Sequence, residues 1–148
     1  MDEVSVTIAA APERVWALVT DIPNMGRWSP GCTGGRWTSG ATGPAEGARF
    51  TGSNKHGLLR WSTHCTVIEC EQPRRFAFQV RENKMRWGWK LEPAEGGGTV
   101  LTQWRDRTEA PSLPVRAAAL LIFGGKVDET MVDGMRRTLD AVKADAEA

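Results

Sequence analysis

Residues 4–30 read VSVTIAAAPERVWALVTDIPNMGRWSP, and this stretch decides how the fold begins. Apolar and polar residues alternate over Val4–Ile8, which predicts a half-buried strand. Pro12 suits the first turn of a helix, where its missing N–H would have no partner. Apolar residues then recur at helical spacing until Pro23 ends the helix. The stretch therefore predicts a strand, a helix and a short turn that carries Trp28.

The middle of the chain has the two-residue periodicity of β-strands. Segments rich in Gly, Pro and Asn separate the apolar runs and are short enough to be turns. Short connections favour an antiparallel meander, because parallel strands need crossovers of a dozen or more residues. The predicted strands are Thr33–Ser39, Ala48–Asn54, Leu59–Glu69, Arg75–Glu82, Met85–Leu91 and Thr99–Arg107.

The alternation also predicts which side chains of these strands point inward. In residues 59–69 the more polar alternate set faces outward, so Trp61, Thr63 and Cys65 are expected inside. In residues 99–107 the pattern leaves two alternatives open. The inward set is either Leu101, Gln103 and Arg105 or Val100, Thr102 and Trp104.

A long helix is predicted after Pro114, because an apolar stripe recurs there in steps of three or four residues. Gly124-Gly125 interrupts this helix at a cost of roughly 1 kcal/mol per glycine relative to alanine. The two glycines either let the helix bend and open a portal near Phe123, or allow close contact with the sheet. The stripe consists of Leu120, Phe123, Val127, Met131, Met135, Leu139 and Val142.

Length and charge narrow the class of protein. A chain of 148 residues predicts one domain over residues 1–148. Nineteen basic and eighteen acidic residues give a net charge of +1, and the basic runs are only pairs, which argues against nucleic-acid binding. The apolar run Ala117–Phe123 is too short for stable membrane insertion, and the acidic start is unlike a signal peptide, so we expect a cytoplasmic protein. Nothing indicates the oligomeric state.

Metal, cofactor and nucleophile chemistry have little support in the sequence. The three cysteines and two histidines form no CxxC or HxxxH motif, so we expect no metal and no cofactor. His64 and Cys65 are neighbours on a strand and should face opposite sides. The chain contains no tyrosine, which excludes a phenol as proton donor.

The order of one strand, a helix pair, six strands and a final helix resembles the START-like superfamily, also called SRPBCC or the helix-grip fold. Within it the chain is most similar to bacterial polyketide cyclase/dehydrase-like proteins. The resemblance implies an α+β fold in which a seven-stranded antiparallel sheet curls around the C-terminal helix and two short helices follow strand 1. It also implies an elongated cavity between sheet and helix. The matching pieces are SVTIAAAPERVWALVTDIPNMGRWSP, GARF, WSTHCTVIECEQPRRFAF, GGGTVLTQW and MRRTLDAVKADAEA.

This resemblance implies a set of cavity-lining residues. Trp16 would join the short helices to the sheet, whereas Trp28 is either a packed corner or a ligand contact near the entrance. Arg105 would bind an anionic oxygen, or else form a salt bridge with Glu109 or Asp106. Each apolar member has core packing as its alternative. The predicted ligand-binding residues are Trp28, Phe50, Trp61, Thr63, Cys65, Phe78, Trp87, Trp89, Gln103, Arg105, Phe123, Met131 and Met135.

The functional expectation is a carrier or sensor of a small hydrophobic molecule such as a lipid, an isoprenoid or a polyketide-like compound. One alternative is a cyclase- or dehydratase-like enzyme that uses the same cavity for positioning and proton transfer. The other is a protein-interaction module. Sequence alone leaves open whether the chain catalyses a reaction.

Overall fold

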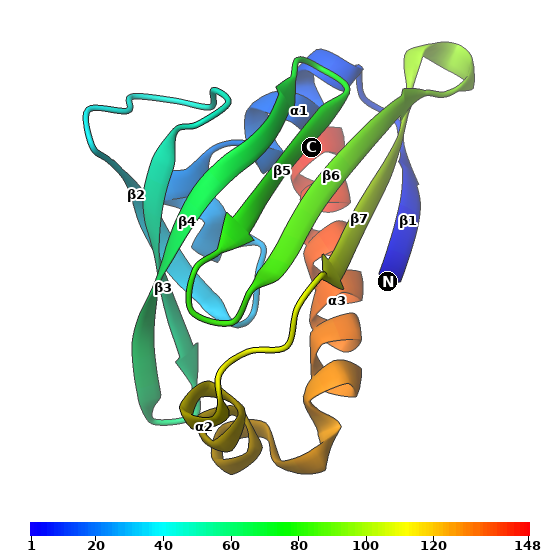
Figure 1. The fold of residues 1–148 in the computed structure, drawn as a ribbon. Coiled ribbons are helices and arrows are strands. Elements are labelled where there is room, and N and C mark those ends of the chain that lie inside the picture. The colour runs from blue at the N-terminus through cyan, green and yellow to red at the C-terminus, as the bar shows by residue number, and fades with distance from the viewer.

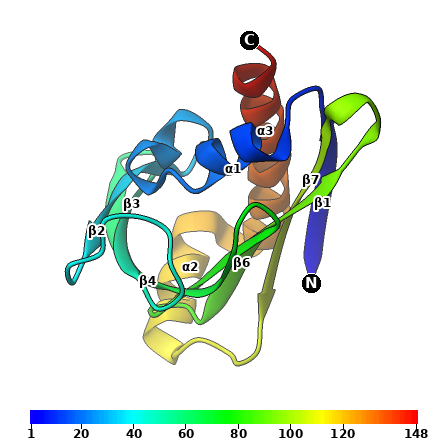
Figure 2. The same ribbon diagram turned by 90° about the horizontal axis from the view of Figure 1, so that it is seen from above.

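A computed structural model describes residues 1–148, except the side chain at position 127. A seven-stranded antiparallel sheet curls around helix α3, and shorter helices lie at its two ends (Figures 1 and 2). This α+β helix-grip fold confirms the predicted fold class. The helices are α1 (Pro12–Val19), α2 (Leu113–Phe123) and α3 (Val127–Glu147), with 3-10 turns η1 (Ile22–Arg27), η2 (Glu95–Gly97) and η3 (Gly124–Lys126). The strands are β1 (Asp2–Ile8), β2 (Cys32–Thr38), β3 (Arg49–His56), β4 (Leu59–Glu71), β5 (Arg75–Val80), β6 (Met85–Pro93) and β7 (Thr99–Arg107).

The strands follow the order β1-β7-β6-β5-β4-β3-β2. Each predicted strand is present, with ends that differ by a few residues. The β3–β4 hairpin is longer than predicted because its turn contains only Gly57 and Leu58. Gly57 has a φ of 61°, a left-handed conformation that glycine adopts without a steric penalty.

The predicted long C-terminal helix is in fact two helices. Gly124 has a φ of 64° and a ψ of −149°, which ends α2, and η3 leads into α3. A Cβ atom at Gly124 or Gly125 would meet nothing within 4 Å, so close contact with the sheet is not the reason for these glycines. Leu120 is largely exposed and does not belong to the buried stripe. The side chain of Val127 lies outside the described residues.

The register of the sheet assigns its inner face. Paired residues of antiparallel strands share one face, and Trp89 pairs with Gln103 while Trp87 pairs with Arg105. Leu101, Gln103 and Arg105 therefore lie on the inner face with Trp87 and Trp89, and this pairing decides the alternative left open for residues 99–107.

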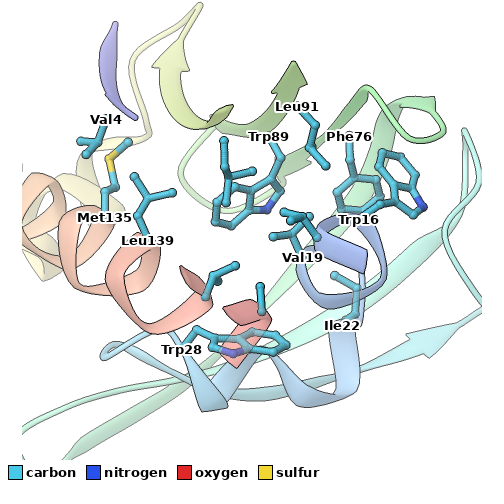
Figure 3. Packing of buried hydrophobic residues seen from close by; sticks show 14 of the residues in the cluster. Val4, Trp16, Val19, Ile22, Trp28, Phe76, Trp89, Leu91, Met135 and Leu139 are labelled. Atoms are coloured by element: carbon cyan, nitrogen blue, oxygen red, sulfur yellow. The ribbon is translucent and has the colours of Figure 1, made fainter. Parts of the chain in front are cut away.

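The core lies between this face and the helices α1 and α3 (Figure 3). Trp16 of α1 packs edge-on against Phe76 of β5, with ring centroids 6.0 Å apart. Leu91 of β6 and Leu139 of α3 are almost completely buried in the same cluster. As predicted, Trp16 joins the short helices to the sheet.

Hydrogen bonds fasten the last turns of helix α3 to the rest of the fold. Arg14 Nε donates a hydrogen bond of 2.7 Å to the carbonyl oxygen of Ala146. The amide of Ala9 donates to Glu147 Oε2 at 2.8 Å, and Lys143 Nζ donates to the carbonyl of Thr7 at 2.9 Å. The C-terminal half of α3 is therefore held by β1 and α1. No described helix has the length and apolar content needed to cross a membrane.

Candidate ligand-binding site

The predicted site residues divide into a deeply buried group and a half-buried group. The buried apolar members belong to the core cluster around α1 and the C-terminal half of α3: Trp28, Phe50, Cys65, Trp89 and Met135. The half-buried members are Trp61, Thr63, Phe78, Trp87, Phe123 and Met131. Gln103 and Arg105 are buried polar residues of β7.

The buried group packs as an ordinary protein core. Trp89 and Met135 lie in the cluster that Figure 3 shows, together with Val4 of β1. Phe50 packs edge-on against Phe78 with ring centroids 5.0 Å apart. For these side chains the core-packing alternative describes what the structure contains.

Trp28 is a packed corner. It follows η1, is 7% exposed, and donates a hydrogen bond from its indole Nε1 to Asp145 Oδ2 at 3.1 Å. The Arg27 guanidinium lies 5.6 Å from the indole centroid and also contacts Asp145. These contacts tie η1 to the last turns of α3.

The half-buried group lies on the inner face toward α2. Trp61 of β4 and Phe123 of α2 approach edge-on with ring centroids 6.3 Å apart. The His56 ring lies 4.7 Å from the Phe123 ring, which joins the β3–β4 hairpin to α2. Phe78 pairs with Trp87 across β5 and β6, so both rings share this face. We call Trp61, Phe78, Trp87, Phe123 and Met131 the apolar lining.

Arg105 is enclosed at the edge of the apolar lining. Its side chain is 4% exposed, and its guanidinium lies 5.8 Å from the Trp87 centroid and contacts two carboxylates. Nε donates to Asp2 Oδ2 at 2.8 Å and the terminal NH2 group to Asp128 Oδ1 at 2.6 Å. The positive charge is therefore already neutralised by this chain.

The predicted salt-bridge partners of Arg105 are wrong. Asp106 points to the other face of β7 and binds Arg86 with contacts of 2.7 and 2.8 Å. The partners that sequence reasoning missed are Asp2, 103 residues away, and Asp128, 23 residues away. Asp2 lies opposite Arg105 in the β1–β7 register, so only knowledge of that pairing could have found it.

Gln103 carries an unpaired acceptor. Its side chain is 9% exposed, and Oε1 has no hydrogen-bond partner in the part of the chain that the structure describes. A buried acceptor without a donor costs roughly 1–3 kcal/mol. A ligand hydroxyl or N–H at this position would remove that cost.

Thr63 and Cys65 form the remaining polar part of the predicted site. Asn54 Nδ2 donates to Thr63 Oγ1 at 3.2 Å, a contact that the sequence did not indicate. Burial raises the pKa of the Cys65 thiol from 9.0 to about 12. The thiol is therefore neutral near pH 7 and is not an activated nucleophile.

The raised pKa predicts slow thiol chemistry at Cys65. A pKa near 12 leaves roughly a thousandth of the thiolate that a pKa of 9.0 would give at pH 8, and burial slows access further. In the Cys32→Ala/Cys70→Ala variant, we expect dithionitrobenzoate to label Cys65 far more slowly than in the same chain unfolded in urea. Because the folded-state pKa is raised, the neutral thiol stabilises the fold fully below pH 9, and this contribution is lost as the pH rises toward 12. Equal labelling rates in folded and unfolded protein would contradict the burial of this thiol.

His64 lies outside the site, on the outer face of β4. Its Nδ1 atom is 2.9 Å from Glu82 Oε2, and its backbone amide donates to Oε1 of the same carboxylate. Among the described residues, no three or more His, Cys, Asp or Glu side chains are grouped to hold a metal ion.

Two surface hollows contain no residue of the apolar lining. One lies along the first half of α3 and is lined by Asp128, Glu129, Val132, Asp133 and Arg136. The other lies where the β1–α1 connection, the η2 turn and the end of α3 meet. An enclosed cavity behind the apolar lining stays a prediction.

Comparison with known families gives a match over almost the whole chain. Residues 3–147 match the family described as polyketide cyclase / dehydrase and lipid transport. No curated protein matches the chain.

Solved structures share the fold. A polyketide-cyclase-like protein from Corynebacterium glutamicum is 33% identical, with 96% of this chain and 88% of that chain covered and a TM-score of 0.62. A protein from Deinococcus radiodurans is 14% identical over 98% and 95% of the two chains, with a TM-score of 0.69. The di-domain ARO/CYC protein StfQ from the steffimycin biosynthetic pathway is 13% identical, with a TM-score of 0.67. That match covers 99% of this chain and 44% of StfQ.

Proposed function

Because the chain belongs to the polyketide cyclase/dehydrase and lipid transport family, we propose that it binds a small hydrophobic molecule as a carrier or sensor. The proposed ligand lies against the apolar lining, on the α3-facing side of the sheet near α2. A lipid, an isoprenoid or a polyketide-like compound has the required apolar surface.

One observation carries the proposal: the apolar lining faces inward yet keeps contact with solvent. Along the same face the rings nearer α1, such as Phe76 and Trp89, are covered by other side chains. Trp61, Phe78 and Trp87 are only half-buried. A ligand that covers them removes apolar surface from water, which is worth roughly 25 cal/mol per Å².

The polar groups near the lining favour binding over catalysis. An acid–base mechanism needs a group that can exchange a proton at the reacting atom. Arg105 is held by two carboxylates and the Cys65 thiol is neutral. Gln103 Oε1 is an acceptor that orients a ligand donor without itself transferring a proton.

The proposal is tested with the Trp87→Ala variant and the uncharged fluorophore N-phenyl-1-naphthylamine. We expect the dissociation constant of the probe to rise about tenfold, equivalent to about 1.4 kcal/mol, because the variant removes an aromatic wall of the site. Fluorescence titration of the folded protein gives this constant. Native mass spectrometry of the purified wild-type chain should in addition detect a co-purifying apolar molecule.

Trp104→Ala is the matched control for Trp87→Ala. Trp104 is also half-buried, lies on the adjacent strand β7, and faces the opposite side of the sheet. Its removal should leave probe affinity within about twofold of wild type. Equal losses in both variants, or no saturable binding to wild type, would exclude a site at the apolar lining.

A further inference from the structure

Exposed leucines gather at the end of the molecule where the β3–β4 hairpin meets α2. Leu58 at the hairpin tip is completely exposed, and Leu121 of α2 is 87% exposed. The contact between the His56 and Phe123 rings joins the two elements. Figure 1 shows both at the opposite end of the sheet from α1 and the C-terminus. We call Leu58, Leu59, Leu113, Leu120 and Leu121 the leucine patch.

Helix α2 is apolar on its inner and outer sides. Val115, Ala119, Ile122 and Phe123 are half-buried and form its inner side, whereas its leucines are exposed. None of its residues is fully buried. Helices that are apolar all round are normally covered, so exposed apolar surface of this extent marks an interaction site.

The two segments that carry the leucine patch contain charges of one sign only. Lys55 and Arg60 flank the hairpin tip, Arg116 lies on α2, and Lys126 lies in η3; all four are exposed. Residues 53–63 and 113–126 contain no Asp or Glu, although the whole chain is nearly neutral. Two exposed acidic residues, Asp128 and Glu129, follow at the start of α3, and Asp128 is bound by Arg105.

From these observations we propose that the leucine patch and its four cations dock this end of the protein onto an anionic lipid bilayer. The leucines enter the boundary between headgroups and acyl chains, and the cations contact lipid phosphates. A bilayer fits better than a protein partner because the leucines come from two separate elements and every charged residue within these two segments is positive. The docking is peripheral, and it stands independently of ligand binding at the apolar lining.

Vesicle co-sedimentation of the intact chain tests the docking. We expect binding to vesicles of phosphatidylcholine with 30% phosphatidylglycerol that is at least about tenfold tighter than binding to phosphatidylcholine alone. The Lys55→Gln/Arg60→Gln variant should bind the anionic vesicles about 25-fold more weakly, since each cation near such a surface contributes about fivefold. Arg36→Gln/Arg49→Gln is the matched control, because both exposed arginines lie away from the hairpin tip, and it should bind as wild type does.

The contribution of the leucines to docking is tested with the Leu58→Asn/Leu121→Gln variant. It should weaken vesicle binding about tenfold or more for each leucine. Ile68→Asn, at an exposed apolar residue of β4 outside the patch, is its control. Circular dichroism confirms folding, and unchanged N-phenyl-1-naphthylamine binding in the leucine variant separates docking from the ligand site. The proposal is overturned if wild type does not prefer anionic vesicles, or if the leucine variant binds them as wild type does. It is equally overturned if the wild-type protein does not bind vesicles and light scattering shows that it self-associates through these leucines. The patch would then be a protein interface.

Discussion

The Phe76→Ala variant is expected to have a free energy of unfolding about 3–5 kcal/mol below that of the wild-type chain. Phe76 is fully buried and packs edge-on against Trp16, and across the sheet it pairs with Trp89. Removing the ring leaves a cavity at the point where α1 joins the sheet. Closing that cavity would require α1 to move toward β5, which its hydrogen bonds to α3 oppose.

Phe78→Ala is the matched control for Phe76→Ala. Phe78 lies on the same strand and face but is only half-buried. Removing its ring therefore loses less buried apolar surface and leaves a smaller cavity. We expect a loss of about 1–2 kcal/mol. Urea denaturation followed by tryptophan fluorescence measures both values. Similar losses in the two variants would mean that the α1–sheet junction is not the most tightly packed part of the core.

The Asp2→Ala/Asp128→Ala variant is expected to lose about 3–5 kcal/mol of unfolding free energy, because it leaves the buried Arg105 guanidinium without its carboxylates. Replacing the arginine instead of its two carboxylate partners is expected to lower the unfolding free energy less. In Arg105→Met the two aspartates stay hydrated, since Asp2 and Asp128 have side chains that are 39% and 81% exposed.

For Arg105→Met we expect a loss below about 1.5 kcal/mol, because methionine keeps most of the packing against Trp87. Urea is the suitable denaturant for this comparison because it is uncharged and does not screen the ion pairs. If Arg105→Met costs more than the double aspartate variant, the arginine contributes mainly through packing, and the desolvation argument fails.

The sequence predicted the strands well because most of them turn one face toward the core, which favours alternation between apolar and polar residues. The inward set of β4 was recognisable from its polar outer residues, and the structure places Cys65 inside and His64 outside. The inward set of β7 was not recognisable from the sequence, since Trp104 on the outer face is as apolar as any inward residue. Only the pairing of Trp89 with Gln103 distinguishes the two sets.

How deeply a side chain is buried was harder to predict than the face of the sheet on which it lies. Periodicity gives Trp61 and Trp89 the same inward assignment, yet one is half-buried and the other is in the core. Their difference depends on which helix lies opposite, and this follows from the break at Gly124. The steps of three and four residues continue through that break, so the pattern alone predicted one helix. Contacts between distant residues, such as Arg105 with Asp2, leave no trace in local sequence.

Because the last turns of α3 are attached to the fold, the C-terminal end of this chain is expected to be more ordered than the internal segment that contains α2. Terminal helices commonly fray from their free end, but here the carboxyl-terminal residues bind β1 and α1, while α2 has no fully buried residue. Local opening would therefore start inside the chain, around residues 113–126, and spread toward both ends. Amide hydrogens of the final helical turns should outlast those of α2 in exchange, and a tag fused to the carboxyl terminus would perturb the tertiary structure more than an insertion between α2 and α3.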